Sequence, residues 1–178
     1  MAADLILPVD AELEALAALA ADIGATLGQR GQMLATAESC TGGWVATTLT
    51  AIAGSSRWFE RGFVTYANAA KEEMLGVPAT TLQRHGAVSQ ATARAMAQGA
   101  LAHSRADWAL AITGIAGPGG GSPEKPVGTV CFAWAGRERG CCAQTLRLAG
   151  DRAAVRAQAV AHALRVQIDL LAGTPLSA

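Results

Sequence analysis

Lysine, tyrosine and asparagine are nearly absent from this 178-residue chain, in which arginine is the usual cation. There are two lysines, Lys71 and Lys125, one tyrosine, Tyr66, and one asparagine, Asn68. A lysine can lose its proton in a suitable environment, whereas an arginine cannot. The two lysines are therefore candidates for a chemical role that arginine could not fill.

Charged side chains are also scarce, at 16% of residues, and 14 basic groups balance 14 acidic groups to a formal net charge of zero. A neutral chain offers no basic surface for the phosphate backbone, so we expect no nucleic-acid partner. Hydrophobic residues make up 51% of the chain, which is enough to build a core. The length and composition predict a single domain over residues 1–178.

No disulfide framework, metal-ligand spacing or membrane span is evident. The four cysteines, Cys40, Cys131, Cys141 and Cys142, form no CxxC pair, and the three histidines are not spaced as ligands. No apolar run reaches the length of a bilayer span, and the N-terminal stretch lacks the pattern of a signal peptide. We therefore expect free thiols, no metal, no membrane partner and a cytoplasmic location.

Hydrophobic periodicity predicts strands that alternate with helices in the first two thirds of the chain. Asp10, Asn68 and Ser89 are predicted helix caps. Helices are expected at 10–30, 43–51, 80–85, 89–103 and 151–171, with a short one around Lys71, and strands at 32–37, 62–66, 108–113, 127–135 and 141–148. The last two strands form a predicted hairpin, so this is an α/β fold with a mixed sheet covered on both faces.

The segment Glu-Ser-Cys-Thr-Gly-Gly at 38–43 joins a predicted strand to a predicted helix. Such a junction gathers backbone N–H groups and the positive end of a helix dipole, which can hold a phosphate or a developing oxyanion. A second interpretation is that Ser39 or Thr41 only caps the helix. The segment alone leaves both interpretations open.

The glycine-rich stretch 113–126 leaves the end of a buried strand, where ligands of open α/β sheets bind. It contains neither GxxxxGK[ST] nor a GxGxxG followed by a helix, which disfavours an NTPase or a dinucleotide-binding protein. The alternative is a surface connection without a function. Arg152, at the start of the last helix, either binds a phosphate or faces solvent.

Tyr66 and Lys71 fall at a predicted strand end and on the helix that follows it. A buried lysine near a serine can lose its proton and act as a general base. A lysine followed by two glutamates, as here, is on the other hand commonly a solvated surface residue. The pattern alone does not decide between the two.

Taken in order, these segments resemble the CinA C-terminal domain family from about residue 12 to residue 170. The matching segments are 36–43, 62–68, Lys71, 85–89, 113–118, 125–129 and 150–152. The resemblance implies a three-layer α/β/α sandwich with a mixed, mostly parallel sheet, often assembled as a homodimer. It also implies a cofactor-free amidohydrolase that converts the carboxamide of nicotinamide mononucleotide (NMN) to nicotinate mononucleotide and ammonia.

The resemblance also implies roles for individual residues. Ser39 looks like the nucleophile and Lys71 like its base, and Tyr66 looks like a residue that assists proton transfer. Thr113 and Arg152 look like substrate-binding residues, and we expect the same of their neighbours at the two loops, Thr41, Gly42, Gly43 and Gly114. Two alternatives remain: a general amidase that uses Ser55 or Ser56 with Lys71, and a non-catalytic nucleotide-binding module in competence or DNA-damage regulation.

Overall fold

The computed structural model describes residues 9–175, with side chains from residue 13 onward. The helices are α1 (Val9–Arg30), α2 (Trp44–Thr50), α3 (Asn68–Leu75), α4 (Ala79–His85), α5 (Gln90–Ala102) and α6 (Arg152–Leu171), with a 3-10 helix, η1 (Ser55–Arg57). The strands are β1 (Leu34–Glu38), β2 (Phe59–Val64), β3 (Trp108–Gly114), β4 (Thr129–Gly136) and β5 (Gly140–Arg147). The predicted cap Asp10 lies among residues whose side chains are not described.

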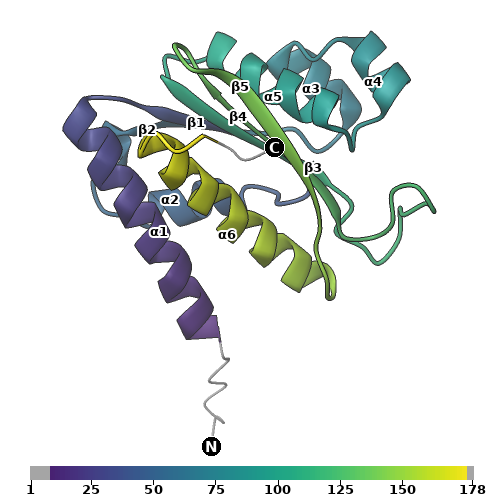
Figure 1. The fold of residues 1–178 in the computed structure, drawn as a ribbon, viewed down its shortest axis with the longest axis horizontal. Coiled ribbons are helices and arrows are strands. Elements are labelled where there is room, and N and C mark those ends of the chain that lie inside the picture. The colour runs from purple at the N-terminus through teal and green to yellow at the C-terminus, as the bar shows by residue number, and fades with distance from the viewer. Residues whose placement is uncertain (1–8, 176–178) are drawn as a thin grey trace, which may run out of the picture.

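The five strands form one sheet in the order β2-β1-β3-β4-β5. β1 pairs in parallel with β2 and β3, whereas β4 is antiparallel to both β3 and β5. β4 alone therefore runs against the other strands. Helices α1, α2 and α6 cover one face of the sheet, and α3, α4 and α5 cover the other (Figure 1). The predicted three-layer α/β/α sandwich with a mixed, mostly parallel sheet is confirmed.

The two faces of the sheet differ in the size of their side chains. In β3, Trp108, Leu110 and Ile112 belong to the core beneath α1 and α6, whereas Ala109 and Ala111 belong to the core beneath α5. Because successive strand residues point to opposite faces, this alternation sorts large side chains to one layer and small ones to the other. Helix α5 packs on the small-residue face through alanines and Met96.

Helix α5 also approaches the end of α3 very closely. A Cβ atom added at Gly99 would lie 2.0 Å from the carbonyl oxygen of Leu75, the last residue of α3. No side chain fits in that space, so glycine is required where the backbone of α5 passes α3. The contact sets the distance between these two helices.

Two local predictions need correction, and one is confirmed. β2 begins at Phe59, three residues before the predicted start, because Phe59 pairs with Leu34 at the beginning of β1. Asn68 is the first residue of α3, and the cap position is Ala67, which makes no side-chain hydrogen bond. Ser89 is the cap of α5, and its hydroxyl accepts a hydrogen bond from the Thr92 N–H at 3.1 Å.

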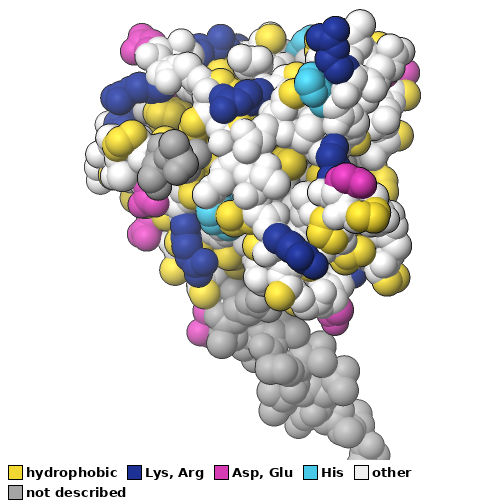
Figure 2. All heavy atoms as spheres, turned by 45° about the vertical axis from the view of Figure 1, so that its right-hand side comes forward, with side chains coloured by type: hydrophobic (Ala, Val, Ile, Leu, Met, Phe, Trp, Pro, Cys, Tyr) yellow, Lys and Arg dark blue, Asp and Glu magenta, His cyan; other side chains and the backbone are white. Residues whose placement is uncertain are grey.

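The surface carries charges of both signs. On the face shown in Figure 2, lysine and arginine side chains are interspersed with acidic and hydrophobic ones rather than gathered into one basic area. Within residues 9–175, no helix combines the length and the apolar character needed to cross a membrane.

Candidate active site

The candidate site lies where the parallel strands β1 and β3 end side by side. The register places Glu38 opposite Ile112, so the residues that follow them, Ser39 and Thr113, are neighbours. The Ser39 N–H donates to the Ile112 carbonyl at 2.9 Å, which fixes the turn after β1 to β3. From β1 the chain turns first to β2 on one side and later to β3 on the other, and ligands of open α/β sheets bind at such switch points.

Lys71 lies in α3 with its amine against Ser39. Its side chain is 1% exposed, and Nζ donates to Ser39 Oγ at 3.1 Å and to the Thr65 carbonyl at 2.8 Å. Burial lowers the pKa of this lysine, because the charged form loses its hydration. Among the described residues the one ion pair is Arg61–Glu60, so no carboxylate holds Lys71 in its charged form. The two glutamates that follow are exposed, but Lys71 itself is not a solvated surface residue.

Glu38 caps helix α2, a role that the sequence analysis missed. Its carboxylate accepts hydrogen bonds from the N–H groups of Gly43 at 3.1 Å, Val45 at 3.0 Å and Ala46 at 2.9 Å. The free N-terminus of α2, expected to hold a phosphate or an oxyanion, is thus already occupied. Neither Ser39 nor Thr41 caps the helix. An acidic residue four positions before the Gly-Gly pair is the one sequence signal for this arrangement.

Three predicted substrate-binding residues lie apart from the cavity around Ser39. The Thr41 side chain is fully buried, and its hydroxyl has no hydrogen-bond partner. The N–H of Gly42 donates to the Ser39 carbonyl, and the N–H of Gly43 is taken by Glu38. None of these three residues lines the cavity, so their contact with a substrate stays a prediction without support from this geometry.

The cavity at the ends of β1 and β3 has a volume of about 260 Å³. Six of the predicted site residues line it together: Ser39, Tyr66, Lys71, Thr113, Gly114 and Arg152. Cys40, Ala87 and Val88 also line it and were not predicted. Burial raises the pKa of the Cys40 thiol to about 11, so this thiol is protonated at neutral pH and a poor nucleophile beside Ser39.

Tyr66 and Arg152 join across the cavity. The Tyr66 hydroxyl accepts a hydrogen bond from Arg152 Nη2 at 2.8 Å, and Arg152 Nη1 donates to the Gly117 carbonyl at 2.8 Å. The hydroxyl of Tyr66 makes no hydrogen bond to Ser39 or Lys71, although its side chain lines the same cavity. Arg152 therefore connects three separate segments: the one before α3, the one after β3 and the start of α6.

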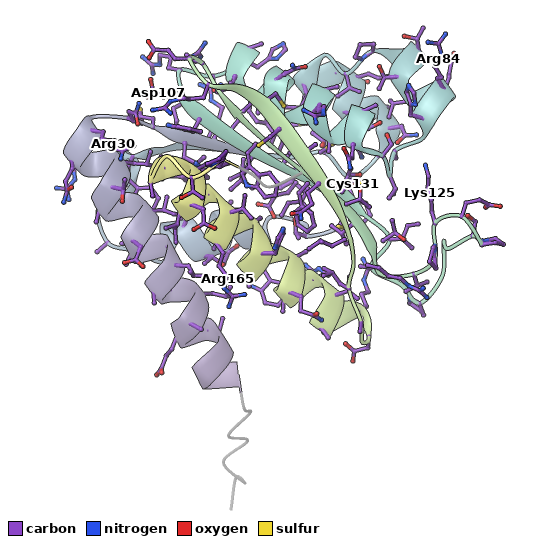
Figure 3. The ribbon with its side chains drawn as sticks, in the orientation of Figure 1. Arg30, Arg84, Asp107, Lys125, Cys131 and Arg165 are labelled. Carbon is purple, nitrogen blue, oxygen red and sulfur yellow. The ribbon has the colours of Figure 1, made fainter. Side chains whose placement is uncertain are left out.

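The loop after β3 is also held by hydrogen bonds to the end of α4 and the segment that follows it. Thr113 Oγ1 donates to the Ala87 carbonyl at 2.8 Å, and Lys125 Nζ donates to the His85 carbonyl at 2.8 Å. Figure 3 shows Lys125 rising from this extended loop toward the layer that contains α4. A cation at the last carbonyls of a helix is favourable, because that end carries partial negative charge. The loop is thus held in place by hydrogen bonds and forms one wall of the cavity, so it is not a loose surface connection.

The amidase alternative loses its base in this structure. Ser55 and Ser56 lie in η1, outside the cavity, and the amine of Lys71 is bonded to Ser39. Within the described residues, no group of three or more histidine, cysteine or acidic side chains is placed to hold a metal ion. All four cysteines are free thiols.

Comparison with known proteins finds relatives of high sequence identity over most of this chain. The nicotinamide-nucleotide amidohydrolase PncC of Escherichia coli K12 is 56% identical over 147 residues, which cover 83% of this chain and 89% of that protein. A protein of Symbiobacterium thermophilum described as competence-damage inducible is 59% identical over 150 residues, which cover 80% of this chain. This chain spans only about a third of that protein's length, 35%.

The fold matches solved structures as well. The competence/damage inducible protein CihA of Agrobacterium tumefaciens superimposes with a TM-score of 0.86 at 50% sequence identity, covering 88% of this chain and 95% of that one. The family model described as the CinA C-terminal domain matches residues 16–171. This chain belongs to the CinA C-terminal domain family.

Proposed function

We propose that this protein is an amidohydrolase that converts the carboxamide of NMN to a carboxylate, releasing ammonia. The observation that carries the proposal is the buried amine of Lys71, 3.1 Å from the Ser39 hydroxyl. The choice of substrate is supported by the name of the E. coli relative, a nicotinamide-nucleotide amidohydrolase. A protein that only bound nucleotides would need neither a buried lysine nor its contact with a serine.

In the first step Ser39 Oγ attacks the carboxamide carbon while neutral Lys71 Nζ takes the hydroxyl proton. The amine must be neutral to accept a proton, and burial favours that form. The positively charged pyridinium ring of the substrate would lower the lysine pKa further. The Thr65 carbonyl accepts one N–H of the amine and so holds Nζ in place toward Ser39.

In the second step the tetrahedral intermediate collapses, and its C–N bond breaks. Lys71 returns the proton to the leaving nitrogen, which departs as ammonia and leaves an ester on Ser39. Lys71, neutral again, then takes a proton from a water molecule that attacks the ester carbon. Collapse of this second intermediate returns the proton to Ser39 Oγ and releases the carboxylic acid, which loses its remaining proton to solvent to give the carboxylate product.

The oxyanion requires N–H donors other than those of α2, which Glu38 occupies. The backbone N–H of Cys40 directly follows Ser39 and donates to no other residue in the described part of the chain. Cys40 also lines the cavity, so its N–H is the available donor for charge on the carbonyl oxygen. The reaction as derived uses only side-chain and backbone groups of this chain.

Ammonia release from NMN tests the proposal. Wild-type protein should release one ammonia for each NMN consumed, and Ser39→Ala should abolish turnover while still binding NMN. Ser55→Ala is the matched control, because it removes a buried serine outside the cavity. No release by the wild type, or a Ser39→Ala variant that keeps most of its activity, would rule the proposal out. NMN binding without ammonia would support the nucleotide-binding module instead.

We also propose that the protein forms a homodimer, as the resemblance to the family implies, and that it acts in the cytoplasm, which its free thiols favour. Light scattering of the purified protein tests the first point through the molar mass. Fractionation of cells that express the protein tests the second.

A further inference from the structure

We propose that the phosphate of the nucleotide binds in a second cavity beside Ser39, between Arg152 and Arg156, and that Arg156 supplies the cation that confers selectivity for a phosphorylated substrate. The inference builds on the proposed function, because it assigns a second subsite to the same substrate. Arg156 was not singled out by the sequence.

The size of the first cavity leads to the second. Its volume of about 260 Å³ is below the roughly 300–1,000 Å³ of typical small-molecule sites. A nucleotide whose carboxamide reaches Ser39 must therefore extend beyond it. An adjoining cavity of about 550 Å³ shares Ala116, Gly117 and Arg152 with the first. The shared residues place the two cavities side by side, so a substrate that extends beyond the first cavity would meet the second at the start of α6.

Arg156 lines the second cavity one helical turn after Arg152. One of its terminal nitrogens, Nη2, donates to the Thr41 carbonyl at 2.8 Å, and its guanidinium lies 5.3 Å from the centre of the Trp44 ring. Its Nε is buried and has no hydrogen-bond partner. A buried donor without an acceptor is unfavourable, and a guanidinium offers five N–H groups in a fixed fork. Arg156 thus has donors to spare in a position held by the Thr41 and Trp44 contacts.

Arg152 has less to offer, because two of its nitrogens already donate to Gly117 and Tyr66. One acidic residue, Asp151, also lines the second cavity, but its carboxylate accepts the Ala154 N–H as the cap of α6. Two arginines against one engaged carboxylate leave the cavity with a positive balance. The bidentate fork of a guanidinium suits the oxygens of a phosphate better than those of a neutral ribose hydroxyl.

The charges of both arginines reach the neighbourhood of Ser39. Burial is the dominant effect on the Cys40 thiol and raises its pKa, but the positive charges of Arg156 and Arg152 act in the opposite direction. Cys40 lines the first cavity, so Arg156 is electrostatically close to it. This supports a single site with a reactive end at Ser39 and an anion-binding end at Arg156.

Ala153 provides a test that leaves the contacts of Arg156 intact. Ala153 is exposed and lines the second cavity in the first turn of α6, where an acidic side chain does not destabilise a helix. Ala153→Glu places a negative charge in the cavity, and Ala153→Gln is the matched neutral control. Dissociation constants for NMN, nicotinamide riboside and inorganic phosphate are measured by calorimetry in a Ser39→Ala background, so that no turnover is needed.

We expect Ala153→Glu to raise the dissociation constants of NMN and inorganic phosphate by about 10- to 100-fold relative to Ala153→Gln. The dissociation constant of the riboside should change little. Arg156→Gln should weaken NMN and phosphate to a similar extent and keep riboside binding. Equal affinities of the Glu and Gln variants for NMN and phosphate would overturn the inference, as would equal losses of NMN and riboside in Arg156→Gln. Absence of ammonia release by the wild type would instead refute the proposed function. The phosphate-binding measurements would still test the subsite, because they do not depend on turnover.

Discussion

Arg152 donates a hydrogen bond to the hydroxyl of Tyr66 over 2.8 Å, and so joins the start of α6 to the segment between β2 and α3. The same guanidinium holds the Gly117 carbonyl on the far side of the cavity. The resemblance to the family implied that Tyr66 helps in proton transfer, but its hydroxyl contacts neither Ser39 nor Lys71. We therefore expect Tyr66 to position Arg152 and the walls around the substrate.

Tyr66→Phe distinguishes positioning from proton transfer. Loss of a proton relay would lower kcat by about 10²–10⁴-fold. Loss of a contact that orients Arg152 should instead raise KM for NMN by up to about tenfold and leave kcat within a few-fold. Arg152→Ala should raise KM more, because it frees both Tyr66 and Gly117. Steady-state kinetics with NMN measure both quantities, and a collapse of kcat with unchanged KM in Tyr66→Phe would restore the relay.

Lys71→Arg tests whether the amine acts as a titrating base. Arginine keeps its charge at any working pH and cannot accept the serine proton, so this variant should be nearly as inactive as Lys71→Met. In the wild type, kcat/KM should rise with pH as Lys71 loses its proton. This rise should occur below the ordinary pKa of lysine, because burial lowers the pKa of this group. Substantial activity in Lys71→Arg would mean that the lysine contributes only positive charge.

Lys71 should also leave a mark on folding stability. Its pKa is lowered in the folded state, so the unfolded chain binds more protons between that lowered value and the ordinary lysine value. Stability must then rise with pH across this window. Urea unfolding at several pH values should show the wild type gaining stability relative to Lys71→Met as the pH increases. A constant difference between the two proteins would mean that the amine titrates alike in both states.

Chelation should leave the activity unchanged. The derived reaction uses a serine, a lysine and backbone N–H groups, and the described residues hold no cluster of metal ligands. Ammonia release from NMN is measured with and without EDTA. Loss of activity that a divalent ion restores would contradict the serine–lysine mechanism.

Glu38→Gln tests the cap of α2. The amide keeps the shape of the side chain but loses its charge. Its NH2 group would also face the backbone N–H groups at the start of α2, which are donors themselves. We expect a loss of about 1–3 kcal/mol in the free energy of unfolding. Glu73→Gln, at an exposed position of α3, is the matched control and should change stability by less than about 0.5 kcal/mol. Similar unfolding midpoints in urea for the two variants would contradict the capping role.

Most of the fold could be predicted from the sequence because hydrophobic residues recur with clear helix and strand periods. The strand that contains Trp108 to Thr113 and the helix capped by Ser89 were predicted to within a residue or two. The start of β2 was missed, since Phe59 joins the sheet only by pairing with Leu34, a contact distant in sequence. Local preference carries no information about such a partner.

For the site, motifs identified Ser39 and Lys71, and the structure brings them together. Glu38 and Arg156 escaped because their roles depend on tertiary contacts. Glu38 acts on N–H groups five to eight residues away, and Arg156 meets Thr41 across 115 positions. Thr41, Gly42 and Gly43 were expected at the substrate because the start of α2 was assumed to be vacant, an assumption that Glu38 removes.

The close passage of α5 by α3 has a consequence for how this protein can vary. Lys71 sits one turn before Leu75, whose carbonyl leaves room only for a hydrogen at position 99. A methyl group there must move α3 or α5, and any shift of α3 carries the lysine amine with it. Reacting groups misplaced by about 1 Å can lose about 10²-fold in rate. Position 99, although it contacts no substrate, should therefore tolerate substitution as poorly in a screen for activity as the catalytic residues themselves.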